Sequence, residues 1–155
     1  MIRIARPEDI DTILELGLEC HEKAHTEYTV DIPDARKVIA QFVQSPAKFA
    51  MVKDDGGEVL GVLLGFLSPV WYSKAREGSD LLFYVRTDPR SVGAGTMLLK
   101  RFMRWSEERG AAGLSMAESF GGPTASTTNK IFRKQGFTEV GGLHVIQFNQ
   151  QEKPS

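Results

Sequence analysis

The segment from Val85 to Thr96 combines residue types that suit the binding of a phosphate group. It reads Val-Arg-Thr-Asp-Pro-Arg-Ser-Val-Gly-Ala-Gly-Thr and joins a predicted strand to a predicted helix. The first amides of a helix have no intrahelical acceptor, and the helix dipole places partial positive charge beside them. Gly93 and Gly95 leave these amides unobstructed, and Arg90 adds a full positive charge. The pattern therefore predicts a cradle for a pyrophosphate.

Two common phosphate-binding loops do not match this segment. A Walker loop ends in Gly-Lys-Ser/Thr, whereas Gly95 is followed by Thr96 and Met97. A dinucleotide-binding fingerprint needs a third glycine at the position of Leu98, and it belongs near the start of a βαβ unit. Here the loop follows two predicted helices and a predicted hairpin, so neither class fits.

The elements around this loop can be placed from hydrophobic periodicity and turn residues. Apolar residues at helical spacing indicate two helices before residue 46, and Asp54-Asp55-Gly56-Gly57 between two apolar runs indicates a hairpin. In the first half of the chain we expect a strand at 2–4, a helix at about 7–23, a second helix that ends at 44, and strands at 49–52 and 59–67. A loop at 68–79 then leads to a strand at 81–85 and a helix that ends at about 109. The rest should form a strand at 114–116, an interruption of regular structure at Gly121-Gly122-Pro123, a helix at 126–135 and strands at 137–140 and 143–148. This order predicts one α+β domain over residues 1–149 and a flexible tail at 150–155.

Composition excludes several classes of function. The formal net charge is -1 with no block of like charge, so nothing favours a nucleic-acid partner. The single cysteine, Cys20, cannot form an intrachain disulfide, and no Cys/His cluster has metal-ligand spacing. No run of about 18 apolar residues is present for a membrane span, and no apolar signal core is seen. We therefore expect a cytoplasmic protein without a metal or a membrane partner.

The phosphate loop resembles the cofactor motif of the GNAT superfamily of N-acetyltransferases. That motif reads Arg/Gln-x-x-Gly-x-Gly/Ala after a strand ending in Val, and it is matched by Arg90, Gly93, Gly95 and, upstream, Val85. Gln135-Gly136-Phe137 is similar to the Leu-Gly-Phe that ends the family's last helix. The order of elements agrees over residues 1–148. The chain looks closest to the small GNAT proteins common in phage and prophage genomes.

This resemblance implies a fold, a co-substrate and a reaction. The fold would be a mixed, mostly antiparallel sheet of about six or seven strands flanked by about four helices. Acetyl-CoA would donate its acetyl group directly to a primary amine, with the thioester lying where the strands at Leu81 and Leu114 splay apart. The implied cofactor-binding residues are Phe83, Tyr84, Val85, Arg90, Ser91, Val92, Gly93, Ala94, Gly95, Thr96, Asn129 and Phe132.

The last helix departs from the family pattern. The family often has a tyrosine four residues before the Gly of Gly-Phe, where it protonates the departing thiolate, but this chain has Phe132. The family's asparagine position is occupied by Ala125, and Asn129 comes one turn later. Water or the hydroxyl of Ser126 or Thr127 would have to replace the acid. Two alternatives therefore stay open: a coenzyme-binding regulatory or interaction module without catalysis, and an enzyme for longer acyl chains.

The general base and the acceptor are not specified by a motif. Glu118, just past the strand at 114–116, is the first candidate base, followed by Asp80 and Tyr84 on the preceding strand and by His21 and His25. Such residues are more often solvated or structural. Trp71 and Tyr72 would stack on a substrate, cover the core or form a dimer contact. The acceptor is expected to be a small-molecule or peptide amine, and a homodimer is left open.

Overall fold

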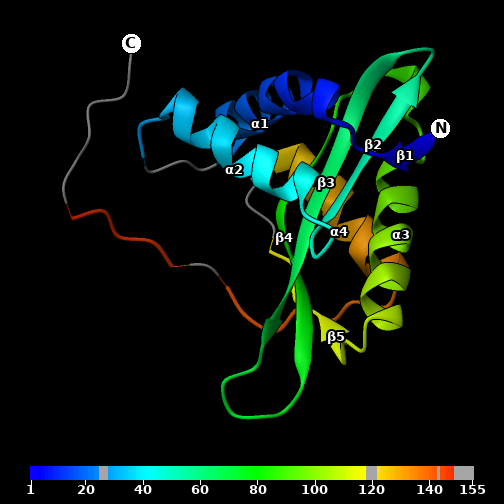
Figure 1. Cartoon of the computed structure of the whole chain (residues 1–155). Coiled ribbons are helices and arrows are strands. Elements are labelled where there is room, and N and C mark those ends of the chain that lie inside the picture. The colour runs from blue at the N-terminus through cyan, green and yellow to red at the C-terminus, as the bar shows by residue number, and fades with distance from the viewer. Residues whose placement is uncertain (25–27, 118–121, 143, 149–155) are drawn as a thin grey trace.

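A sheet of five strands, in the order β1-β2-β3-β4-β5, forms the middle layer of the structure (Figure 1). The structure is a computed structural model that describes residues 1–24, 28–117, 122–142 and 144–148, with the backbone alone for residues 122–126. The strands are β1 (Ile2–Ile4), β2 (Phe49–Asp55), β3 (Glu58–Pro69), β4 (Arg76–Val85) and β5 (Gly113–Leu114). The helices are α1 (Ile10–Lys23), α2 (Ile32–Gln44), α3 (Ala94–Glu108) and α4 (Gly122–Lys134), with single 3-10 turns at Pro7–Asp9 and Pro89–Ser91.

Each face of the sheet packs against helices, and the alternation of strand residues divides the core in two. One cluster joins α1 and α2 to the sheet through Ile13, Leu16, Phe42 and the strand residues Val62 and Leu64. The other joins α3 to the opposite face, where Leu63 packs with Phe49, Leu98 and Phe102. The amphipathic helices predicted from periodicity therefore bury the expected stripes.

The β2–β3 hairpin is confirmed, and its turn requires glycine. Gly56 and Gly57 have φ angles of 60° and 95°, a region that side-chain-bearing residues rarely adopt. The irregular loop expected at residues 68–79 is wrong, because β3 runs to Pro69 and β4 already begins at Arg76. Backbone pairing of Ser68 with Glu77 continues the ladder past the apolar run, so hydrophobicity gives no sign of it.

The sheet changes character at β4. Strands β1 to β4 are antiparallel neighbours, whereas β5 runs parallel to β4 and pairs with it only at Glu77 and Gly78. In the described part of the chain, β5 therefore diverges from β4 beyond Gly78. The chain after β5 stays near β4 as far as Ala117, whose amide hydrogen-bonds to the carboxylate of Asp80.

The C-terminal expectations need correction. Helix α4 begins at Gly122, not near residue 126, because a helix tolerates proline in its first turn and the Gly-Pro pair lies there. The described residues of 137–148 contain no strand, so the described sheet has five strands instead of six or seven. Val140 and Phe148 are 93% and 88% exposed, which shows that this segment has not buried its apolar side chains. The α+β class and the mixed, mostly antiparallel sheet are confirmed, and the tail lies outside the described residues.

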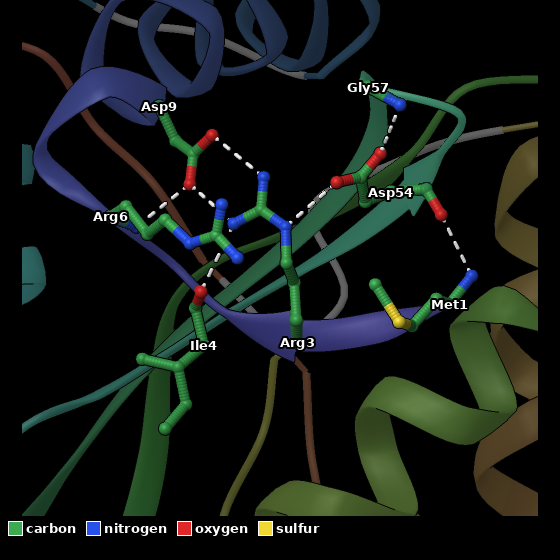
Figure 2. A network of polar contacts seen from close by, with 7 residues as sticks. All are labelled: Met1, Arg3, Ile4, Arg6, Asp9, Asp54 and Gly57. Carbon is green, nitrogen blue, oxygen red and sulfur yellow. Dashed lines mark hydrogen bonds and ion pairs between the residues drawn. The ribbon is translucent and has the colours of Figure 1, made fainter.

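A polar network holds the N-terminal strand in place (Figure 2). The guanidinium of Arg3 donates to Asp9 at 2.7 Å and to Asp54 at 2.8 Å, and all three side chains are largely buried. The terminal amine of Met1 donates to the carbonyl of Asp54, whose side chain also accepts the amide of Gly57. The network joins β1 to the β2–β3 turn and to the start of α1, so it is structural.

Candidate active site

A cavity of about 530 Å³ lies where the end of β4, the start of α3 and helix α4 meet. Its walls come from three segments that are distant in sequence. The lining residues are Phe83, Tyr84, Val85, Arg86, Thr87, Asp88, Ser91, Val92, Gly93, Gly95, Thr96, Thr127, Thr128 and Ile131. The predicted phosphate loop and the predicted β4 residues therefore line one cavity.

The start of α3 offers backbone donors to this cavity. Gly93 precedes the helix with a φ angle of 80°, and no side chain caps the helix there. The amides of Ala94, Gly95 and Thr96 are the first of the helix, so they have no intrahelical acceptor. Ser91 adds a hydroxyl that lines the cavity and is buried without a hydrogen-bond partner in the structure. An unsatisfied buried hydroxyl costs about 1–3 kcal/mol, which an anionic ligand oxygen would recover.

Gly95 has a second role that sequence reasoning did not anticipate. A Cβ atom at this position would lie 3.2 Å from Ile131 Cδ1 and 3.8 Å from Phe83 Cζ. The glycine therefore lets α3 approach α4 closely, in addition to leaving the helix start open. A large side chain at Gly95 would disturb this packing as well as ligand binding, so a charged replacement there does not test binding alone.

Arg90 lies beside the cavity and not among its lining residues. Its guanidinium donates to Glu58 at 2.8 Å and to Asp88 at 2.9 Å, and Asp55 lies 3.6 Å away. Hydrogen bonds from Arg90 lower the pKa of Asp88 to about 2. Arg90 thus ties the phosphate loop to the β2–β3 turn in this structure, and its direct contact with a pyrophosphate stays a prediction.

Arg86 lines the cavity and was missed by the sequence analysis. Its guanidinium donates to Glu19 on α1 at 2.6 Å, with Glu15 at 3.9 Å. The ion pair lowers the pKa of Glu19 and raises that of Arg86. The two partners are 67 residues apart in the chain, so no local signal marks the pair. Because nearby carboxylates balance both Arg86 and Arg90, the positive potential at the cavity comes chiefly from the helix start.

Three predicted cofactor residues, Ala94, Asn129 and Phe132, are not among the residues that line the cavity. Ala94 is buried at the start of α3, and Asn129 is half-buried on α4. Phe132 is buried between Phe83 and Phe137, with ring centroids 6.4 Å and 5.0 Å away. The α4 residues that line the cavity are instead Thr127, Thr128 and Ile131, one turn earlier or on the neighbouring face.

Tyr84 lies on β4 between the cavity and helix α1. It lines the cavity, but its side chain is buried in the core cluster with α1, whereas Phe83 and Val85 pack on the α3 face. The ammonium of Lys23 donates to its hydroxyl at 2.9 Å and lies 5.3 Å from the ring centroid. The contact raises the pKa of Lys23. The hydroxyl is thus engaged in an interaction between β4 and α1.

Asp80 is the described carboxylate with the most altered acidity. It lies at an irregularity in β4, where the pairing of Leu64 with Leu82 is followed by that of Gly65 with Asp80. Burial raises its pKa from 3.8 to about 6, although its own amide and that of Ala117 lower it. A carboxylate with such a pKa is ionised at neutral pH and binds a proton readily. Asp80 lies on β4 just beyond Gly78, where β5 diverges.

The other candidate bases lie outside the described residues or have no altered environment that favours a base. Glu118, His25 and Ser126's side chain lie outside the described parts of the structure. His21 is half-buried near the end of α1. Burial raises the pKa of the Cys20 thiol to about 11, which excludes it as a thiolate nucleophile at neutral pH. Among the described candidates, Asp80 combines the altered pKa with the position on β4.

Comparison with known protein families decides the assignment. The model of the acetyltransferase (GNAT) family matches residues 10–137, which include the cavity, β4 and the phosphate loop. This chain belongs to the GNAT family. The predicted resemblance is therefore confirmed at the level of the family. A search of curated proteins found no match.

Solved structures of acetyltransferases share the fold of this GNAT protein. A predicted acetyltransferase from Clostridium acetobutylicum, solved with acetyl-CoA, has a TM-score of 0.76 at 14% identity, covering 95% of both chains. A ribosomal-protein-alanine N-acetyltransferase from Brucella melitensis has a TM-score of 0.69 at 17% identity, covering 96% of this chain and 99% of its own. An aminoglycoside antibiotic 6'-N-acetyltransferase from Acinetobacter haemolyticus has a TM-score of 0.70 at 14% identity, covering 96% of this chain and 98% of its own. At such identities the likeness establishes the fold. Within the described residues, no helix has the length and apolar character of a membrane span.

Proposed function

We propose that this protein binds acetyl-CoA in the cavity at the start of α3 and transfers the acetyl group to a primary amine. The observation that carries the proposal is the uncapped start of α3, opened by Gly93 and flanked by the unpartnered hydroxyl of Ser91. Membership of the GNAT family supports acetyl transfer. Two structural neighbours are named as N-acetyltransferases, one for a ribosomal-protein alanine and one for an aminoglycoside, which supports nitrogen as the acceptor atom.

The residues present fit the diphosphate and the extended arm of the co-substrate. The amides of Ala94, Gly95 and Thr96 would donate to the diphosphate, as amides at helix starts commonly do. Strand β5 diverges from β4 beyond Gly78, which gives an extended ligand access to the backbone of β4 toward Val85, where it can pair with the amides of the co-substrate. Val92, which is 86% exposed and lines the cavity, leaves the approach to the amides open.

The chain would contribute positioning and proton transfer to the reaction. When bound, acetyl-CoA supplies an acetyl group activated as a thioester. Asp80 lies on the same strand as the cavity, toward the point where β4 and β5 separate. Its carboxylate would take the proton that the amine nitrogen loses as the new nitrogen–carbon bond forms, and solvent would protonate the released thiolate. Such base catalysis contributes about 10²–10⁴-fold to a rate.

A coenzyme-binding module without catalysis is the second candidate, and Phe132 favours it. This residue stands where the family often has a proton-donating tyrosine, and its ring is buried against Phe83 and Phe137. It has no proton to donate. A thiolate of coenzyme A is a tolerable leaving group, so the loss of a general acid slows transfer without preventing it. An enzyme that transfers a longer acyl chain is a variant of the first candidate, the transferase.

Calorimetric titration with acetyl-CoA tests the binding step, with Val92→Glu as the decisive variant. A carboxylate there would lie about 6 Å from two phosphate charges; at an effective dielectric constant of about 40 the repulsion is about 3 kcal/mol, or about 100-fold in Kd. Glutamate near a helix start does not destabilise the helix. Met97→Glu is the matched control, since Met97 is 49% exposed on α3 and does not line the cavity. Equal binding by both variants would contradict the proposed site.

Release of free thiol with a panel of amines then separates the two candidates. The panel would include peptide N-termini, lysine, polyamines and aminoglycosides. Turnover with any of them, reduced at least about 100-fold in Asp80→Asn, supports the enzyme and its base. Tight binding of acetyl-CoA without turnover on any acceptor supports the non-catalytic module.

A further inference from the structure

The β3–β4 hairpin projects beyond the sheet as an arm. The last pair between β2 and β3 is Phe49 with Gly65, yet β3 continues to Pro69 with β4 as its partner. We call residues 66–79 the arm, and Figure 1 shows it extending past the other strands, next to β5. The base of the arm still packs on the domain, through Phe66 and Gly78, whereas residues 71–74 at its tip are exposed.

The tip of the arm presents an ordered pair of aromatic side chains to solvent. Trp71 is 93% exposed and Tyr72 is 75% exposed, with their rings in edge-to-face contact at 5.4 Å. The turn is held by backbone hydrogen bonds from Val70 to Ala75 at 2.9 Å and from Ser73 to Val70 at 3.1 Å. An exposed tryptophan on a rigid turn is costly in water and loses little entropy when it binds, so it suits an interface.

A second cavity, of about 480 Å³, lies at the base of the arm. It is formed by the end of α3, strand β5 and the chain that follows α4. Its lining mixes the apolar side chains of Met103, Leu114 and Phe137 with polar groups, among which Glu107 is the charged residue. This cavity is large enough for an aromatic side chain, and its carboxylate suits a neighbouring cation.

The tip and the cavity lie on one element, about one arm's length apart, so a twofold axis could bring each tip to the other copy's cavity. Gly113, which lines the second cavity, pairs with Glu77 at the base of the arm. About five residues separate this base from the tip, a distance of about 15 Å along a strand. If two arms lie side by side in opposite directions, each tip reaches the other's base. Both contacts then form at once, as a closed twofold dimer requires.

We propose that the protein forms a homodimer in which Trp71 of each copy inserts into the second cavity of the other copy. Lys74, near the tip, then approaches Glu107 of the opposite copy, so the charges are complementary. The cavity proposed for acetyl-CoA is lined by Phe83 to Val85, at the other end of β4 from the arm. Dimerisation leaves that cavity accessible, and the inference does not depend on the activity.

Sedimentation equilibrium over a wide range of protein concentration tests the dimer. We expect a mass of twice the 17.2 kDa of one chain. Trp71→Ala removes a central aromatic anchor from both copies, which weakens the dimer roughly 1,000-fold. Tyr28→Ala is the matched control, because Tyr28 is also an exposed aromatic, at 62%, and lies outside the arm. The control variant is expected to keep the wild-type association.

Charge exchange tests the pairing of tip and cavity directly. Lys74→Glu and Glu107→Lys are each expected to weaken the dimer, and the double variant is expected to recover it. A monomeric wild type overturns the proposal, as does a dimer that withstands Trp71→Ala, which would use a different surface. Failure of the double variant to recover association overturns it as well. Circular dichroism of every variant establishes that the fold is retained.

Discussion

Replacement of Asp80 by asparagine is expected to lower activity and raise stability at the same time. Burial raises the pKa of Asp80 from 3.8 to about 6, so the folded protein favours the protonated form. In the unfolded chain the same carboxyl ionises near its ordinary value. Asp80→Asn keeps the shape and stays neutral at every pH, which removes the penalty for burying a charge.

The size and the pH dependence of the effect follow from this pKa. A rise from 3.8 to about 6 corresponds to about 3 kcal/mol at full ionisation, as an upper limit. A carboxyl whose pKa is raised in the folded state is neutral in both states below its unfolded pKa, and the penalty grows as pH rises to the folded pKa. The advantage of Asp80→Asn should therefore be small below about pH 4 and reach a plateau above about pH 6.

Urea unfolding of both proteins at pH 4, 5, 6 and 7.5 measures this difference. At the plateau the free energy of unfolding of Asp80→Asn should exceed that of the wild type by up to about 3 kcal/mol. Thermal unfolding should show a melting temperature higher by up to about 10 °C, since 1 kcal/mol shifts a domain of this size by about 2–4 °C. Acid effects of other carboxylates occur in both proteins and cancel. In parallel, kcat/KM of the wild type should fall below about pH 6, as the base becomes protonated. A variant that is less stable at pH 7.5 than at pH 4, relative to the wild type, would refute this account of Asp80.

Three further predictions concern stability. Gly65→Ala should destabilise the fold by about 2 kcal/mol in urea unfolding, because its Cβ would lie 2.4 Å from the ring of Phe102. Asp9→Asn should cost about 2 kcal/mol at pH 7, because Arg3 lowers the pKa of Asp9; the loss relative to wild type should shrink as pH falls below about 4, and a pH-independent loss would contradict the pairing. Ser106→Ala should leave the free energy of unfolding unchanged or raise it by up to about 1 kcal/mol, because the buried hydroxyl of Ser106 has no hydrogen-bond partner to lose. Thermal unfolding should therefore show an unchanged or higher melting temperature.

The elements that sequence predicted well are those whose signals are local. The β2–β3 turn follows from two adjacent glycines, both with positive φ in the structure. The start of α3 follows from residues within one short segment, where Asp88 caps the 3-10 turn by accepting the amide of Arg90. In both places a few neighbouring residues determine the backbone, so their types are sufficient evidence.

The features that sequence missed depend on contacts between distant residues. The arm is held by pairs such as Pro69 with Arg76, which carry no hydrophobic alternation because both side chains face solvent. Arg86 was overlooked because its partner, Glu19, is on another helix. The closing strands were expected from apolar residues such as Val140, but an apolar pattern forms a strand only where an edge accepts it.

The amides at the start of α3 can be observed directly while coenzyme A is added. In a titration of isotope-labelled protein followed by amide NMR, we expect the largest shifts at Ala94, Gly95 and Thr96, since these N–H groups would donate to the diphosphate. Inorganic pyrophosphate should shift the same three signals at higher concentration. Saturating coenzyme A that leaves these three amides unchanged would contradict the assignment of this cavity.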